Sequence, residues 1–195
     1  KRLWKKMMIY ALPLLIAGLA GITNETIDRV LLKHLLPTED STYQLGIYGA
    51  LYKLSIIMIL FIQTFRFAAE PFFFDHHKKK DDRRVYADVM KYFTIITAFI
   101  FLAVMIYYGL VQQFIGVNFH DERGAVIVPI LLLANLFLGI YYNLAVWFKL
   151  TEKTRYGAYL SLFGALITLG LNFALIPILG FEGSAWATLI CYAAM

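Results

Sequence analysis

Seven ionisable side chains interrupt the first two apolar stretches of the sequence. They are Glu25, Asp28, Arg29, Lys33, Lys53, Arg66 and Glu70. The guanidinium of arginine is planar and permanently charged, so it suits phosphate oxygens, whereas carboxylates in an apolar setting can bind protons or cations. Residues of these types indicate a site for a charged ligand.

The apolar surroundings limit where these charges can lie. A charged side chain at the centre of a bilayer costs about 2.5–3.5 kcal/mol, so seven of them facing lipid would cost on the order of 20 kcal/mol. That exceeds the typical net stability of a domain, about 5–15 kcal/mol. Most of the seven must therefore snorkel, pair with one another or face an aqueous cavity.

Helical spacing shows which of these side chains can act together. Glu25 and Arg29 are four residues apart and can form an ion pair. One face of the same helix carries small residues followed by acidic ones, namely Gly18, Gly21, Glu25 and Asp28. We expect the Asp28 and Arg29 pair to line a polar cavity.

The second stretch carries a similar face, formed by Gln63, Arg66 and Glu70. Arg66 is expected to line the cavity, because its fork-shaped cation is the better candidate for phosphate. For Lys33, Lys53 and Glu70, which lie closer to the ends of their stretches, simple snorkelling or pairing is an equal alternative.

Composition indicates that lipid surrounds the elements that position these residues. Apolar residues make up 61% of the 195-residue chain and charged residues 16%. Soluble domains average roughly 45–50% apolar and about 25% charged residues. A membrane protein explains this balance best.

The distribution of charge predicts six helical spans. Residues 92–115, 125–148 and 156–179 each comprise 24 residues without a charge, enough to cross a bilayer. The second span depends on topology, because Lys53 divides it into two short uncharged stretches. We expect an all-α, polytopic membrane bundle forming a single lobe over residues 1–195, with spans at about 7–36, 46–74, 88–115, 125–148, 156–179 and 183–195, the last one truncated.

Basic residues alternate between the connections. Thirteen lysines and arginines fall in the leading segment and in the second and fourth connections, whereas only Arg123 falls in the others. Because positive residues bias a loop toward the cytoplasm, the N-terminus of the chain is expected there. The chain starts on Lys1 and its last uncharged run covers 13 residues, so we expect both ends to belong to a longer protein.

Other functions lack the residues that they need. Cys191 is the single cysteine, which excludes a disulfide framework and zinc-finger spacing, and the basic clusters form no stripe suited to nucleic acid. Asp75, His76 and His77 could suggest a metal site, yet such a mixed run beside lysines is far more often solvated. No nucleophile triad or phosphate loop occurs, so neither an enzyme nor a bound cofactor or metal is expected.

Three segments carry a resemblance to a known family. They are YALPLLIAGLAGITNETIDRVLLKHLL at 10–36, LGIYGALYKLSIIMILFIQTFRFAAEPFFF at 45–74 and LNFALIPILGFEGSAWATLICY at 171–192. The first two resemble the seventh and eighth helices of Wzx-type polysaccharide flippases, within the multidrug/oligosaccharidyl-lipid/polysaccharide exporter superfamily. The third resembles the pattern at the eleventh and twelfth helices of that family.

The resemblance implies the second lobe of a two-lobe transporter whose N-terminal lobe precedes this chain. Such a protein would move an undecaprenyl-diphosphate-linked oligosaccharide across the bacterial inner membrane by rocking one lobe against the other. It further implies that Arg29, Lys53 and Arg66 neutralise the diphosphate and that Asp28 orients it or couples an ion. Glu25 and Glu70 are expected to take part in coupling or pairing.

Two other functions remain open at this point. In an H⁺- or Na⁺-coupled drug antiporter of the same superfamily, Glu25 and Asp28 would bind the ion. A membrane glycosyltransferase or polymerase is a weaker alternative, because such enzymes usually need a large loop and the longest connection here has about 15 residues. A non-catalytic scaffold would leave the buried charges unexplained.

Overall fold

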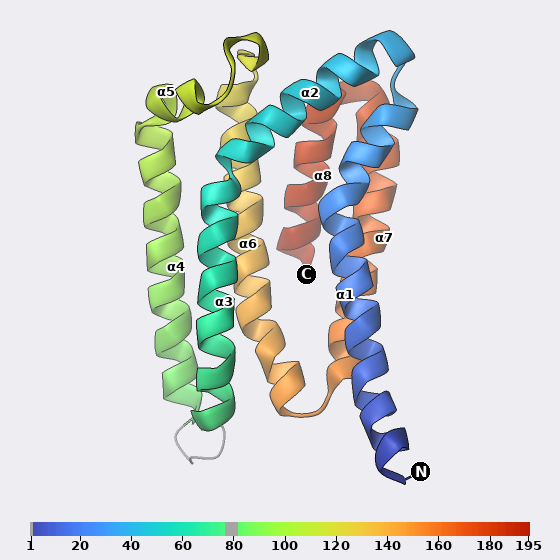
Figure 1. The fold of residues 1–195 in the computed structure, drawn as a ribbon, viewed down its shortest axis with the longest axis vertical. Coiled ribbons are helices and arrows are strands. Elements are labelled where there is room, and N and C mark those ends of the chain that lie inside the picture. Colours follow the sequence, from blue (N-terminus) through green and yellow to red (C-terminus); the bar gives the residue numbers. More distant parts are fainter. Residues whose placement is uncertain (1, 77–81) are drawn as a thin grey trace.

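The structure, a computed structural model, describes residues 2–76 and 82–195 as a bundle of helices (Figure 1). In chain order the helices are α1 (Arg2–Leu35), α2 (Thr38–Leu54), α3 (Ile56–His76), α4 (Asp82–Ile106), α5 (Tyr108–Val111), η1 (Gln112–Phe114), η2 (Val117–Phe119), α6 (Gly124–Leu150), α7 (Thr154–Leu179) and α8 (Phe181–Ala194), where η marks a 3₁₀ helix. The described part contains no strand. Within the described residues, five helices are long and apolar enough to cross a membrane, namely α1, α3, α4, α6 and α7, so the chain is an all-α, multi-pass membrane protein.

The longest apolar runs of the sequence become the most regular spans. The predictions for 125–148 and 156–179 are confirmed, since α6 is Gly124–Leu150 and α7 is Thr154–Leu179. Within lipid, backbone polar groups have no water to bond, so an uninterrupted apolar run must satisfy them within its own helix.

The second predicted span, 46–74, is not one helix. The helix that begins at Thr38 ends at Leu54, and α3 starts at Ile56. At the break, the hydroxyl of Ser55 donates to the carbonyl oxygen of Tyr52 at 2.7 Å, and the Ser55 amide donates to the same oxygen. Serine competes with the helical backbone in this way. The membrane-crossing part is therefore Ile56–Asp75, and Lys53 precedes it.

The third and sixth spans also differ from the prediction. For 88–115, the helix ends at Ile106 and the chain turns into the short α5, although the sequence stays uncharged to residue 115. The sixth, 183–195, corresponds to α8, whose 14 residues are fewer than the roughly 20 that cross a bilayer. The count of six spans therefore stays a prediction.

The two ends of the bundle differ (Figure 1). At one end, which we call the basic end, lie the start of α1, the end of α3, the start of α4 and the connection between α6 and α7. At the other, the capped end, lie α2, the segment from α5 to η2 and the turn between α7 and α8. Figure 1 shows α2 running obliquely across this end, while α1 lies along α7.

The hydrophobic core lies beneath α2. Tyr48 and Leu51 of α2 are fully buried and belong to one cluster with Leu131 of α6 and Phe181 of α8. Gly180 allows the tight turn that brings α8 back, because its φ of +59° is a conformation that side chains rarely adopt. The amide of Phe181 then donates to the side-chain oxygen of Gln44, which joins the turn to α2. Packing of α2 against α6 and α8 therefore closes the bundle at the capped end.

Candidate functional site: a polar cavity within the bundle

A cavity of about 500 Å³ lies inside the bundle, bounded by α1, α3, α6, α7 and the end of α8. Its wall mixes charged, amide, hydroxyl and aliphatic side chains. The polar members are Asn24, Glu25, Gln63, Arg66, Glu70, Tyr141, Tyr142, Lys149, Thr154, Ser161 and Tyr192. A space of this size and polarity between spanning helices is suited to a ligand rather than to structural packing.

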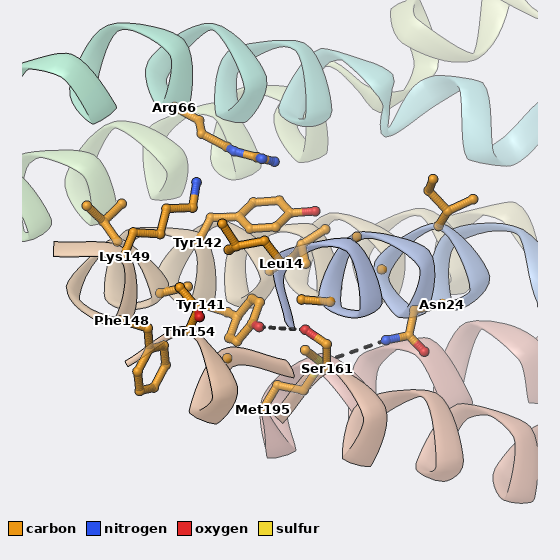
Figure 2. A pocket seen from close by; sticks show the side chains of 18 of the residues that line it. Leu14, Asn24, Arg66, Tyr141, Tyr142, Phe148, Lys149, Thr154, Ser161 and Met195 are labelled. Atoms are coloured by element: carbon orange, nitrogen blue, oxygen red, sulfur yellow. Dashed lines mark hydrogen bonds between the residues drawn. The ribbon is translucent and has the colours of Figure 1, made fainter. Parts of the chain in front are cut away.

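Arg66 provides the cavity with a cation held by an aromatic ring. Its guanidinium carbon lies 4.7 Å from the ring centre of Tyr142 on α6, as Figure 2 shows. Within the described residues, no carboxylate oxygen lies within 4.0 Å of the guanidinium. A cation over a ring keeps its hydrogen-bond donors at the edge of the guanidinium, where an anionic ligand can reach them.

Glu25, on α1, contacts Tyr142 as well. The hydroxyl of Tyr142 donates to a carboxylate oxygen of Glu25 at 3.4 Å. Tyr142 therefore contacts a carboxylate of α1 through its hydroxyl and a cation of α3 through its ring face. Tyr142, a neutral side chain of α6, thus links Glu25 on α1 to Arg66 on α3.

The second cation, Lys149, forms an ion pair. Its Nζ atom lies 2.6 Å from a carboxylate oxygen of Glu70, so the last turn of α6 is tied to α3. Sequence reasoning counted Lys149 among the basic residues of a connection and did not include it in the site. The flexible stem of a lysine at a helix end lets its charge reach back along the bundle.

Small residues on α1 leave space for the cavity. Gly18 and Gly21 both line it, and a Cβ atom built on either would meet no atom within 4 Å. Glycine at these positions therefore does not serve close helix packing. Of the predicted α1 face, Gly18, Gly21 and Glu25 line the cavity and Asp28 does not, whereas Gln63, Arg66 and Glu70 of the α3 face all line it.

Asp28 lies outside the cavity, in a closed environment. It is only 2% exposed, and its carboxylate accepts a hydrogen bond from the Tyr48 hydroxyl at 2.6 Å and one from the Arg29 amide at 2.7 Å. The bond from Tyr48 joins α1 to the oblique helix α2. Both groups that donate to the Asp28 carboxylate are uncharged, and Asp28 does not line the cavity.

Arg29 and Lys53 are also separated from the cavity. The guanidinium carbon of Arg29 lies 4.4 Å from the ring centre of Tyr52, again linking α1 and α2. Among the described residues there is no Arg29 ion pair with Glu25, because each of these side chains interacts with a tyrosine instead. Lys53, in the last turn of α2, is exposed. The six predicted site residues thus divide into Glu25, Arg66 and Glu70 in the cavity wall and Asp28, Arg29 and Lys53 away from it.

Several cavity residues carry no signal in the sequence. Tyr141 and Tyr142 lie within an uncharged run in which aromatic residues are common, and the hydroxyls of Tyr141 and Ser161 lie 2.9 Å apart, linking α6 to α7. Asn24 contacts Met195, the residue after α8, through its amide nitrogen (Figure 2). Only packing of distant helices brings these residues together.

A separate ion pair lies at the capped end. The side chain of Arg123 donates two hydrogen bonds to Asp121, each at 2.9 Å, and its guanidinium lies over the ring of Phe181. These hydrogen bonds hold the pKa of the Asp121 carboxyl below its ordinary value. This pair stabilises the start of α6 and does not face the cavity.

Possible metal ligands do not gather within the described residues. No group of three or more histidine, cysteine, aspartate or glutamate side chains lies together there. Of the run considered at Asp75, His76 and His77, the last residue lies outside the described part of the chain.

The fold and the cavity define a class of protein: a multi-pass helical membrane protein with a polar interior. Comparison of the chain with protein families, with curated proteins and with solved structures gave no match.

Proposed function

We propose that this chain forms one lobe of a flippase that moves an undecaprenyl-diphosphate-linked oligosaccharide across the bacterial cytoplasmic membrane. The observation that carries the proposal is Arg66, a cation that faces a cavity of about 500 Å³ inside a membrane bundle without a carboxylate partner among the described residues. A cation inside the membrane without a carboxylate partner costs free energy, so its presence favours an anionic ligand that neutralises it. A diphosphate is such a ligand, and arginine recognises it well.

The lining of the cavity suits an amphiphilic cargo. Hydroxyls of Tyr141, Ser161 and Thr154 can exchange hydrogen bonds with a saccharide, and aliphatic side chains such as Leu14 and Leu138 share the wall. Ligand sites usually combine an apolar wall with a few polar groups in this manner. With the basic end at the cytoplasm, as the distribution of lysine and arginine favours, loading would occur from the side where the lipid-linked sugar is made.

The proposed mechanism is alternating access between this lobe and a second lobe. The ion pair between Lys149 and Glu70 joins α3 to α6 at the cavity wall, so it is positioned to hold one arrangement of these helices. Ligand phosphate competing for Lys149 would weaken that link. Binding energy would then favour the other arrangement of the helices.

Transport by the full-length protein in liposomes tests the proposal. Labelled undecaprenyl-diphosphate oligosaccharide is supplied on one leaflet, and its appearance on the other is measured. Arg66→Gln removes a charge-assisted contact worth about 1.5–3 kcal/mol, so transport should fall at least about tenfold. Lys53→Gln is the matched control, because it removes an exposed cation outside the cavity. Normal transport by Arg66→Gln would contradict the proposal.

One observation favours the second candidate, an H⁺- or Na⁺-coupled antiporter of a drug or cation. Glu25 also faces the cavity, and intramembrane carboxylates commonly bind coupling ions. In this case Glu25→Gln would abolish export driven by an ion gradient, while Arg66→Gln would leave it intact. Measuring both variants with both substrates separates the two functions.

A further inference from the structure

We infer that the segment from α5 to η2, residues 108–119, lies in the headgroup layer of the membrane at the capped end and anchors the bundle to lipid there. The segment is short and irregular, yet its outer side is strongly apolar. Phe114 is 84% exposed and Val117 is 80% exposed, and Leu110 is exposed as well. A connection bathed in water would be expected to show polar side chains at these positions.

The depth of the preceding helix places this segment at the boundary of the bilayer. The candidate span in α4, Arg84–Ile106, has 23 residues. At a rise of 1.5 Å per residue it covers roughly 34 Å, slightly more than the roughly 30 Å of a hydrocarbon core. The candidate span therefore ends close to the far boundary of the bilayer, where the chain turns at Tyr107. Figure 1 shows α5 leaving the axis of α4 across the end of the bundle.

The exposed apolar residues of the segment come directly after an exposed apolar stripe on α4. Ile95, Phe99, Leu102 and Ile106 are exposed and recur every three or four residues, so they form one stripe along α4. The exposed residues of the segment follow this stripe in the chain, and no charge occurs from residue 92 to residue 119. A lipid surface that covers the stripe therefore extends to the segment.

The other side of the segment is held by protein. Ile115 is buried, and the ring of Phe119 lies so close to Gly46 of α2 that a Cβ atom there would come within 3.3 Å. The ring nitrogen Nε2 of His120 donates to the carbonyl oxygens of Gln112 and Ile115, at 3.1 and 3.3 Å. Satisfying these carbonyls lets irregular backbone lie next to lipid.

Charge marks where the anchor ends. Asp121, Glu122 and Arg123 follow the segment directly, and Glu122 is exposed. Tyr107, which is 61% exposed, stands at the turn before the segment, and tyrosine prefers the boundary between lipid and water. A tyrosine before the segment, apolar side chains on its outer side and charged residues after it are typical of a segment that lies at the membrane–water interface.

Spin labels on the full-length protein in phospholipid vesicles test this inference. All cysteines are first replaced, including Cys191 by serine, and single cysteines are then introduced at Phe114, Val117, Phe99 or Glu122 for labelling. Collision with oxygen, which concentrates in lipid, is compared with collision with the water-soluble complex Ni-EDDA. We expect labels at 114 and 117 to collide more with oxygen than with Ni-EDDA, as the label at 99 does, and the label at 122 to show the reverse order.

Two results would overturn the inference. Dominant Ni-EDDA collision at 114 and 117 would place the segment in water. Low collision with both reagents would mean that protein covers it, either a second copy or another part of the full-length chain. Using both positions keeps the test valid if one substitution prevents folding, and the label at 99 confirms that the bundle is inserted.

Discussion

Two clusters in this molecule contain the same chemical groups in different surroundings. At the contact of α1 with α2, Arg29 lies over Tyr52, and Asp28 accepts from Tyr48. At the cavity, Arg66 lies over Tyr142, whose hydroxyl donates to Glu25. The aspartate of the first cluster is closed off within protein, whereas both charged groups of the second line an open space.

The comparison teaches that a charge inside a membrane helix does not by itself mark a ligand site. In the cluster of Asp28 and Tyr48, short hydrogen bonds complete the carboxylate, so its role is to hold α2 against α1. In the cavity, none of the described residues accepts a hydrogen bond from the guanidinium of Arg66, so its donors can bind a ligand. Four predictions test this difference.

The largest effect is expected on stability at the closed cluster. Tyr48→Phe removes the hydroxyl that completes the buried Asp28, so the free energy of unfolding should fall by about 1–3 kcal/mol. Unfolding by sodium dodecyl sulfate in mixed micelles measures it. Tyr43→Phe is the control, because that ring is exposed on the same helix. Equal stability of the two variants would remove the structural role that we give to Asp28.

The ion pair of the cavity should show a smaller energy. A double-mutant cycle with Glu70→Gln and Lys149→Met should give a coupling energy of about 1 kcal/mol, because both side chains are partly shielded from solvent. The contact between Arg123 and Glu182 is longer, at 3.9 Å, and more exposed, so the same cycle there should give less. Similar coupling in both pairs would show that the cavity provides no special environment.

The two arginine and tyrosine contacts should separate stability from transport. A cation over a ring contributes about 0.5–1 kcal/mol at a partly exposed site, which corresponds to a change of roughly two- to fivefold in rate. Tyr142→Leu should slow transport by this factor, while Tyr142→Phe, which keeps the ring, should slow it less. Tyr52→Leu should leave transport per folded molecule unchanged. If Tyr52→Leu slows transport as much as Tyr142→Leu, the two clusters are not functionally distinct.

The smallest effect is expected for the ion pair of Arg123 and Asp121 at the capped end. This pair lies outside both clusters and serves as a reference for them. Its hydrogen bonds from Arg123 lower the pKa of Asp121 below 3.8. The resulting stabilisation is complete above the pKa of the unfolded chain and is lost as the pH falls through the lower pKa of the folded state. Unfolding curves of wild type and Arg123→Gln should therefore converge on the acid side of pH 3.8. A constant difference at all pH values would contradict this assignment.

The sequence by itself determines the class of the fold. Runs of 24 uncharged residues predict helices, because backbone groups in lipid must bond within their own segment, and two of the three runs fold as one continuous helix each. Helical periodicity also predicted which residues share a face, namely Gln63, Arg66 and Glu70 on α3 and Gly18, Gly21, Glu25 and Asp28 on α1. It did not predict that Asp28 alone of these residues would lie outside the cavity.

Tertiary structure decided the rest. Periodicity orders residues around one helix, but it does not say which helix lies opposite, so Lys149 and Tyr142 could not be assigned to the cavity from their positions in the chain. The end of the helix at Ile106 likewise could not be predicted from hydropathy, because the sequence stays uncharged from residue 92 to residue 119. Asp28 and Arg66 are both intramembrane charges in the sequence, and only the arrangement of the tyrosines around them separates a closed contact from an open site.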